Sequence, residues 1–135
     1  MPDRLNVVVD LAADRRPWAD DAVRFFDAAI TRGVELLFSA ASITTLFYVV
    51  RREGNASSAM RAIDFALASM TIVPADRATV AAAVALAGRD FEDDLHIATA
   101  LDAGADLIVT RNGRDFERSP IRAVDAAEAL HLITA

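Results

Sequence analysis

The chain has 135 residues, a formal charge of −6 and a hydrophobic fraction of 54%, and it contains no cysteine. This length suits one domain with a buried core, and the lack of cysteine excludes disulfides and thiolate metal sites. No apolar run reaches the roughly 18 residues that a membrane span requires. Residues 1–4 lack the basic and then apolar pattern of a secretory signal, so we expect a cytoplasmic protein.

The acidic charge balance argues against non-specific binding of nucleic acids, because attraction to phosphates needs an excess of cations. It is compatible with a nuclease whose metal site is built from carboxylates. All 14 basic residues are arginine, which suits bidentate phosphate contacts but is also expected from codon bias in a GC-rich genome. Arg111, Arg114, Arg118 and Arg122 form a cluster near the C-terminus. This cluster is either a phosphate-binding surface or a solvated loop.

Short apolar runs alternate with helical patterns along the chain. The valine run before Asp10 predicts a buried parallel strand, and Pro17 followed by Asp20 and Asp21 predicts a helix start. Five strands are expected, at 5–9, 34–38, 71–73, 107–110 and 121–124. Six helices are expected between and after them, at 18–32, from about 43 to 53, from about 56 to 67, from about 77 to 88, from about 91 to 103, and at 125–132.

Capping residues and apolar spacing refine these helices. Asn55 and Asp76 are expected to cap two of them, and Ser39 or Ser42 a third. The residues expected on the apolar faces are Val23, Phe26 and Ile30 in the first helix, Ile43, Leu46, Phe47 and Val50 in the second, and Met60, Ile63 and Leu67 in the third.

The alternation of strands and helices predicts an α/β fold with three layers, in which a mainly parallel central sheet is flanked by helices. The strand at 121–124 follows Pro120 and is expected at an edge of that sheet. No linker, repeat or low-complexity segment is visible. Residues 1–135 are therefore expected to form a single domain.

Acidic side chains lie at the ends of several expected elements. Asp10 directly follows the first strand, residues 110–115 follow the strand at 107–109, and Asp93 lies in the first turn of a helix. Ligands of open parallel sheets bind beyond the carboxyl ends of the strands, so these acids are candidates for one Mg²⁺ or Mn²⁺ site. Such an ion can activate water and stabilise charge on a phosphodiester. The competing interpretation is that Asp90 or Asp93 is a helix cap.

Two motifs in the C-terminal half resemble those of PIN domains. Residues 93–98 match the family pattern Asp-x-Leu-x-x-Ala, and residues 108–116 resemble a subgroup with Thr-Arg-Asn and a following Asp-Phe. The resemblance implies that Asp93 is a metal ligand. It places Asn112 and Asp115 together at the next acidic site of the family.

The resemblance also implies an activity. PIN domains of this kind are Mg²⁺- or Mn²⁺-dependent endoribonucleases, and many are the toxins of bacterial toxin–antitoxin pairs. The candidate catalytic residues are therefore Asp10, Asp93, Asn112 and Asp115, of which the three acids would hold the ion. The expected partners are an RNA substrate, an antitoxin protein and a second copy of the chain in a homodimer, with no membrane involved.

The first half departs from the family pattern, in which an acid follows the first strand. In one register, residues 6–18 are matched to the family segment that begins with the first acid. This register places Arg4 at the position of that acid, with Asp3 one residue away. A second register makes residues 5–9 the first strand and Asp10 the first acid. We favour the first register on sequence match, while the valine run supports the second.

A second departure concerns an early helix, where Thr45 takes the place of the usual glutamate. A hydroxyl can bond a metal-bound water, but it is a weak substitute for a carboxylate. If Arg4 also replaces the first acid, its guanidinium would pair with Asp93 or Asp115 without metal. The alternative function is then a degenerate, non-catalytic PIN-like domain that acts as a binding module. His96, three residues after Asp93, is expected either near substrate or in a structural role.

Overall fold

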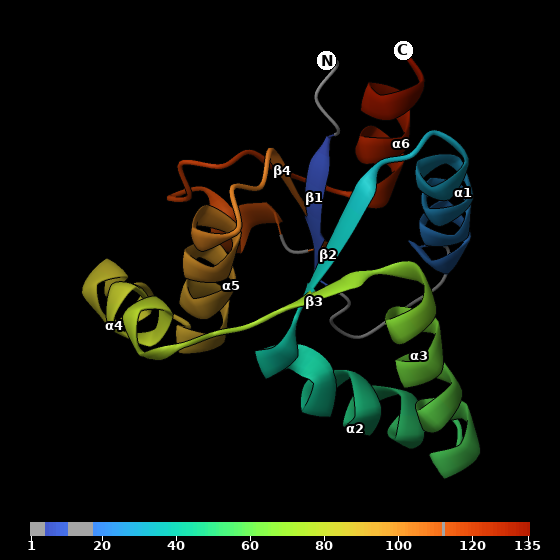
Figure 1. The fold of residues 1–135 in the computed structure, drawn as a ribbon, viewed down its shortest axis with the longest axis horizontal. Helices are drawn as coiled ribbons and strands as arrows, with labels where there is room; N and C mark the ends of the chain where they lie inside the picture. The colour runs from blue at the N-terminus through green and yellow to red at the C-terminus, as the bar shows by residue number, and fades with distance from the viewer. Residues whose placement is uncertain (1–4, 11–17, 112) are drawn as a thin grey trace.

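The computed structural model describes residues 5–10, 18–111 and 113–135. A five-stranded sheet is flanked by helices (Figure 1). The elements are β1 (Asn6–Val9), α1 (Trp18–Thr31), β2 (Glu35–Ser39), the 3-10 helix η1 (Ala40–Ser42), α2 (Ile43–Glu53), α3 (Ala56–Ser69), β3 (Thr71–Val73), α4 (Arg77–Leu86), α5 (Phe91–Asp102), β4 (Leu107–Val109), the 3-10 helix η2 (Gly113–Phe116), β5 (Ala123–Val124) and α6 (Ala126–Thr134). Within these ranges, no helix has both the length and the apolar character needed to cross a membrane.

β1 is the central strand of the sheet, whose order is β3-β2-β1-β4-β5. Val7 of β1 lies opposite Leu36 of β2 on one side and Leu107 of β4 on the other. All strand pairs are parallel, so the carboxyl ends of the strands lie at the same edge. The predicted α/β fold with a parallel sheet is confirmed. Asp10, which follows β1, is in the middle of that edge.

The two faces of β1 belong to different apolar clusters. Val7 and Val9 lie in a cluster with side chains of α1 and α6, whereas Val8 lies in a cluster with side chains of α5 and η2. Figure 1 shows α4 and α5 on one side of the strands and α1 and α6 on the other. Burial on both faces explains why β1 is an unbroken apolar run without polar alternation.

Polar side chains cap the helices largely as predicted. Asn55 at α3 and Asp76 at α4 each accept a hydrogen bond from the backbone N–H three residues later, at 2.8 and 3.0 Å. Ser39 caps η1, because its Oγ accepts from the N–H of Ala41 at 3.2 Å. Ser42 directly precedes α2 but makes no capping bond with its side chain. Its hydroxyl instead contacts a residue of α5.

The predicted apolar face of α1 is wrong at Val23 and Ile30, whereas Phe26 packs against the core as expected. Val23 and Ile30 were expected to face the sheet, but they are 60% and 52% exposed. The buried residues of this helix are Ala22, Phe25 and Ala29. The true face is therefore rotated by one residue, or about 100°.

The same error occurs in α3, where Met60 and Leu67 are exposed while Ala59 and Ala66 are completely buried. Alanine has no side chain beyond Cβ, so an alanine face allows a helix backbone to lie close to its neighbours. The larger apolar side chains are then left on the outside. Hydrophobic spacing alone cannot indicate this arrangement, because it weights large side chains above alanine.

The edge strand β5 is present but shorter than predicted, since it begins at Ala123 and not at Ile121. Ser119 forms a turn just before it. The hydroxyl of Ser119 donates to the carbonyl of Ile121 and also accepts from its N–H, at 2.8 and 3.0 Å. These bonds occupy the backbone groups of Ile121 that a strand would have used.

Candidate active site

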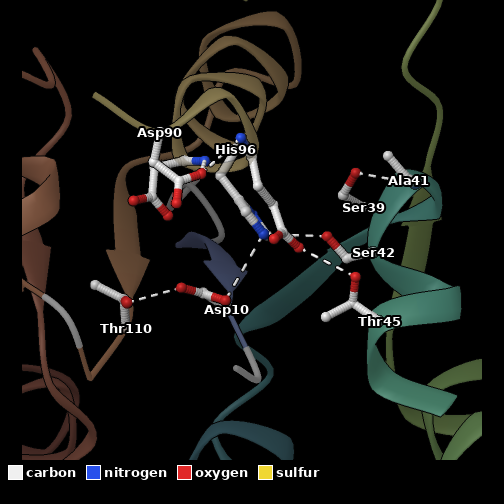
Figure 2. Close-up of polar contacts among 10 residues, drawn as sticks. Asp10, Ser39, Ala41, Ser42, Thr45, Asp90, His96 and Thr110 are labelled. Carbon is white, nitrogen blue, oxygen red and sulfur yellow. Dashed lines mark hydrogen bonds and ion pairs between the residues drawn. The ribbon is translucent and has the colours of Figure 1, made fainter. Parts of the chain in front are cut away.

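A buried carboxylate lies at the carboxyl end of β1. Asp10 is 5% exposed, and its backbone N–H donates to the carbonyl of Val109 at 2.8 Å. Its Oδ2 accepts a hydrogen bond from the hydroxyl of Thr110 at 2.8 Å, as Figure 2 shows. The side chain of Asp10 is thus held between the ends of two adjacent strands, β1 and β4.

The position of β1 distinguishes the two registers of the first half. β1 comprises Asn6–Val9, so Asp10 follows the strand, whereas position 4 precedes it in the chain. The register that sequence match favoured is therefore wrong about the first strand, because the valine run itself forms the centre of the sheet. Arg4 and Asp3 lie outside the described residues.

His96 of α5 lies against Asp10. Its side chain is almost fully buried, and its Nε2 is 3.7 Å from Oδ1 of Asp10 and 3.1 Å from Oγ of Ser42. Figure 2 shows these three side chains meeting between β1, α5 and the start of α2. Carboxylate oxygens only accept hydrogen bonds, so a proton on Nε2 suits this arrangement. Nδ1 is buried without a hydrogen-bond partner among the described residues.

A second polar contact joins α2 to α5 beside this group. The hydroxyl of Thr45 donates to Oε2 of Glu92 at 3.1 Å. Both residues line a small cavity, of about 10 Å³. Its lining residues are Asp10, Phe38, Ser42, Thr45, Leu46, Glu92 and His96. The position where the family carries a glutamate on the early helix is thus paired with a glutamate from α5.

Asp93 lines a different and larger hollow, of about 830 Å³, between the start of α5 and η2. The residues around it are Leu86, Gly88, Arg89, Asp90, Asp93, Asp94, Ile97, Arg114, Glu117 and Arg118. Asp93 is half-buried and lies three residues before His96, on nearly the same side of α5. Asp10 lines the small cavity and Asp93 lines the large one, so the structure places the two predicted acids on neighbouring parts of one edge of the sheet.

Two further acids at the start of α5, Asp90 and Asp94, have structural roles. Oδ1 of Asp90 accepts hydrogen bonds from the N–H groups of Glu92 and Asp93, at 2.8 and 3.2 Å. The interpretation of Asp90 as a helix cap is therefore confirmed. Asp94 is buried, and its Oδ2 accepts from the N–H of Gly88 at 2.8 Å. This bond holds the connection between α4 and α5.

The expected fourth site is not placed. Asn112 and the side chain of Asp115 lie outside the described residues. Among the residues that are described, no three His, Asp or Glu side chains are grouped closely enough to hold a metal ion. The predictions for Asn112 and Asp115 therefore stay open.

The donor chemistry of the site fits Mg²⁺ or Mn²⁺. The carboxylates of Asp10, Glu92 and Asp93 and the hydroxyls of Ser42 and Thr45 are all hard oxygen donors. Mg²⁺ commonly keeps several waters and takes only one or two carboxylates from the protein. A complete cage of three protein ligands is thus not a requirement for such an ion.

A sequence model for the PIN domain matches residues 5–114. The chain belongs to the PIN domain family. Asp10, Asp93 and Asn112 lie within the matched span, whereas Arg4 does not. No curated protein sequence matches the chain.

Solved structures confirm the PIN fold. VapBC-1 from nontypeable Haemophilus influenzae is 14% identical with a TM-score of 0.68, and DNA-bound VapBC from Salmonella typhimurium is 16% identical with a TM-score of 0.69. Each match covers 90% of this chain and 98% of the other. PAE2754 from Pyrobaculum aerophilum is 19% identical with a TM-score of 0.66, and the match covers 96% of this chain and 90% of the other. At these identities the likeness concerns the fold.

The structure divides the predicted arginine cluster of this PIN domain. Arg114 and Arg118 line the larger hollow, together with Arg89. Arg118 also donates to the carbonyl of Leu86 at 3.0 Å and so contacts the end of α4. Arg122 forms an ion pair with a glutamate of α6. The cationic part of the hollow therefore includes Arg89, which the sequence cluster did not contain.

Ser42, Glu92 and Thr110 belong to the site but were missed in the sequence. Ser42 was expected only as a helix cap, and Thr110 only as the end of a strand. Glu92 was not singled out within the acidic stretch. One available signal was its position four residues before His96, which places both on the same side of a helix.

Proposed function

We propose that this PIN domain is an endoribonuclease that depends on Mg²⁺ or Mn²⁺ and has Asp10 at its centre. The observation that supports this function best is the burial of a carboxylate at the carboxyl end of the central strand, next to the acidic start of α5. Burial of a charged group is costly unless a partner compensates it. Thr110 donates a hydrogen bond to Asp10 and His96 lies beside it, and a divalent cation would add to this compensation.

Each residue has a distinct part in this proposal. Asp10 and Asp93 would hold the ion, with Asp115 as the third acid and Asn112 as their support, as the family pattern implies. A bound ion of this kind supplies an activated water and neutralises charge on the phosphodiester. The hydroxyl of Thr110 fixes the orientation of the Asp10 carboxylate. Arg89 and Arg114, on the wall of the larger hollow, would contact phosphates of the RNA.

A protein partner is part of the same proposal. Large apolar side chains remain exposed on α1 and α3, including Val23, Ile30, Met60 and Leu67. Large exposed apolar side chains, when they are grouped, are typical of protein interfaces. We therefore propose that the chain is the toxin of a toxin–antitoxin pair in the cytoplasm, that an antitoxin protein covers part of this surface, and that the chain forms a homodimer.

The second candidate is a non-catalytic binding module on the same fold. Thr45 in place of the family glutamate favours it. The two candidates differ in their need for metal. The nuclease requires a divalent ion, whereas the binding module is indifferent to one.

Cleavage of a mixed panel of RNAs by the purified chain tests the proposed function. The reactions contain Mn²⁺, Mg²⁺ or EDTA, and the variants are Asp10→Asn and Asp93→Asn. We expect cleavage only with metal, and a loss of at least about 100-fold in each variant, because the amide removes a negative charge from the ion. Asp64→Asn, which changes an exposed acid on α3, is the control and should cleave normally. Failure of Mn²⁺ both to support cleavage and to raise the melting temperature would favour the binding module.

A further inference from the structure

We infer that Glu92 supplies, from α5, the carboxylate that α2 lacks at Thr45, and that it faces the divalent ion held at Asp10. This inference rests on the proposed function, since it concerns the same ion. It adds a residue outside the Asp10, Asp93, Asn112 and Asp115 set. The first argument is the contact between the two helices, in which the hydroxyl of Thr45 donates to Oε2 of Glu92 at 3.1 Å.

The second argument is the position of this contact. Thr45 and Glu92 line the same small cavity as Asp10, Ser42 and His96. The carboxylate of Glu92 therefore lies where α2 meets this cavity, which is the part of the site that a glutamate at position 45 would occupy. A longer side chain from α5 thus reaches the place that the shorter side chain of Thr45 leaves open.

The third argument is that the carboxylate of Glu92 is available. Only Oε2 is engaged by Thr45, and Oε1 has no hydrogen-bond partner among the described residues. Glu92 is exposed to solvent. An ion can therefore reach it from water without rearrangement of the core.

The fourth argument is that the backbone of Glu92 is held in place. Its N–H donates to Oδ1 of the cap Asp90 at 2.8 Å, which fixes the first turn of α5. Glu92 is four residues before His96, which contacts Asp10, so the two side chains project from the same side of the helix. The cap, the histidine and the contact with Thr45 all direct Glu92 toward the cavity.

The opposing interpretation is that the contact between Thr45 and Glu92 only joins two helices. The two interpretations make different predictions for metal affinity, which can be measured without any RNA. We would titrate the full chain with Mn²⁺, with calorimetry for affinity and electron paramagnetic resonance for bound Mn²⁺. The variants are Glu92→Gln, Thr45→Val and the double variant Thr45→Glu/Glu92→Gln.

We expect Glu92→Gln to weaken Mn²⁺ binding by about tenfold or more and Thr45→Val to weaken it by less, because the latter keeps the charge and loses only its support. The double variant should regain most of the affinity, because it returns a carboxylate from the α2 side. Glu53→Gln, which changes an exposed acid at the end of α2, is the matched control and should bind as the unchanged chain does. Glutamine keeps an oxygen that can accept from Thr45, so Glu92→Gln retains the contact between the helices.

The outcomes separate this inference from the proposed function. Normal Mn²⁺ affinity in Glu92→Gln, together with lost affinity in Asp10→Asn, would overturn the role of Glu92 and leave the nuclease proposal standing. If Glu92→Gln loses affinity for Mn²⁺ and the double variant does not regain it, then Glu92 does not take the place of an acid at position 45. No binding of Mn²⁺ by the unchanged chain would overturn both.

Discussion

Single side chains hold the edge of the sheet where the candidate site lies. Asp10 accepts a hydrogen bond from Thr110 and faces His96. Asp94, in the wall of the larger hollow, accepts a hydrogen bond from the N–H of Gly88. These two buried acids have different roles in the structure. Asp10 lines a small polar cavity. Asp94 is committed to the backbone of the connection between α4 and α5.

Gly88 gives a prediction at this scale. An added Cβ would overlap the carboxylate of Asp94, which is buried and bonded to the N–H of Gly88 itself. Gly88→Ala should therefore lower the free energy of unfolding by about 1–3 kcal/mol, measured by urea denaturation. Gly113→Ala is the control, because a Cβ there meets open space. Equal stability of the two variants would contradict the close contact.

Asp76 gives a prediction about pH. The backbone N–H of Thr79 donates to its carboxylate, and the hydroxyl of Thr79 adds a second bond, so the pKa of Asp76 is held below its ordinary value of 3.8. The stability that this cap contributes is therefore fully present above pH 3.8 and is lost as the pH falls through the lowered pKa. Melting temperatures of the unchanged chain and of Asp76→Asn should differ at pH 7 and converge in strong acid.

Exposed Asp64 provides the comparison for the pH experiment. Asp64→Asn removes a carboxylate from the surface of α3, where no capping bond involves it among the described residues. Its melting temperature should follow that of the unchanged chain across the same pH range. If the melting temperatures of Asp76→Asn and the unchanged chain still differed in strong acid, the stabilising effect of the cap would not depend on the charge of Asp76.

At the scale of the element, the helices are packed through alanine. Ala59 and Ala66 of α3 are completely buried, while Leu67 of the same helix is 65% exposed. Phe26 and Phe65 then meet edge to face between α1 and α3, with ring centroids 5.4 Å apart. The inner face of α3 is small and close-fitting, and the larger apolar side chains of this helix lie further out.

This packing predicts that the same substitution will have a large effect at one position of α3 and a small effect at another. Ala66→Leu should lower the free energy of unfolding by about 1–3 kcal/mol, because the core has no room for the larger side chain. Ala68→Leu should change it by less than about 0.5 kcal/mol, because Ala68 is exposed. Thermal unfolding of both variants measures the difference. Similar losses at both positions would show that helix propensity, and not packing, limits the substitution.

Local patterns in the sequence predicted the elements but not all of their faces. The valine run, the caps at Asn55 and Asp76 and the short strand at 107–109 depend on neighbouring residues, so the sequence indicates them directly. The burial of Ala66 in place of Leu67 depends on how closely α3 approaches the rest of the fold. Sequence spacing contains no information about that distance.

The candidate site shows the same division. The place of Asp10 followed from the end of a strand, and the cap role of Asp90 followed from the start of a helix. The pairing of Thr45 with Glu92, and of Ser42 with His96, joins segments 47 and 54 residues apart. Such pairs arise only where the start of α2 and the start of α5 meet in the folded chain. The family pattern indicated the missing glutamate at Thr45 but not the residue that lies beside it.

At the scale of the whole molecule, the charge and the apolar surface act in different ways. A formal charge of −6 disfavours RNA held by phosphate attraction alone, so the ion and the arginines of the larger hollow would have to offset it. The exposed apolar side chains of α1 and α3 instead suit a protein partner. The two kinds of partner would thus use different parts of the surface.

The central position of β1 has a consequence for the synthesis of the chain. Asp10 is made early, but the hydroxyl that orients it belongs to Thr110, 100 residues later. β1 also pairs with β4, which is close to the C-terminus. On the ribosome, the candidate site therefore cannot assemble until about four-fifths of the protein has been translated. Under the proposed ribonuclease function, an unfinished chain would carry the acid of the site without its surroundings, and it would not yet cleave the messenger RNA that encodes it.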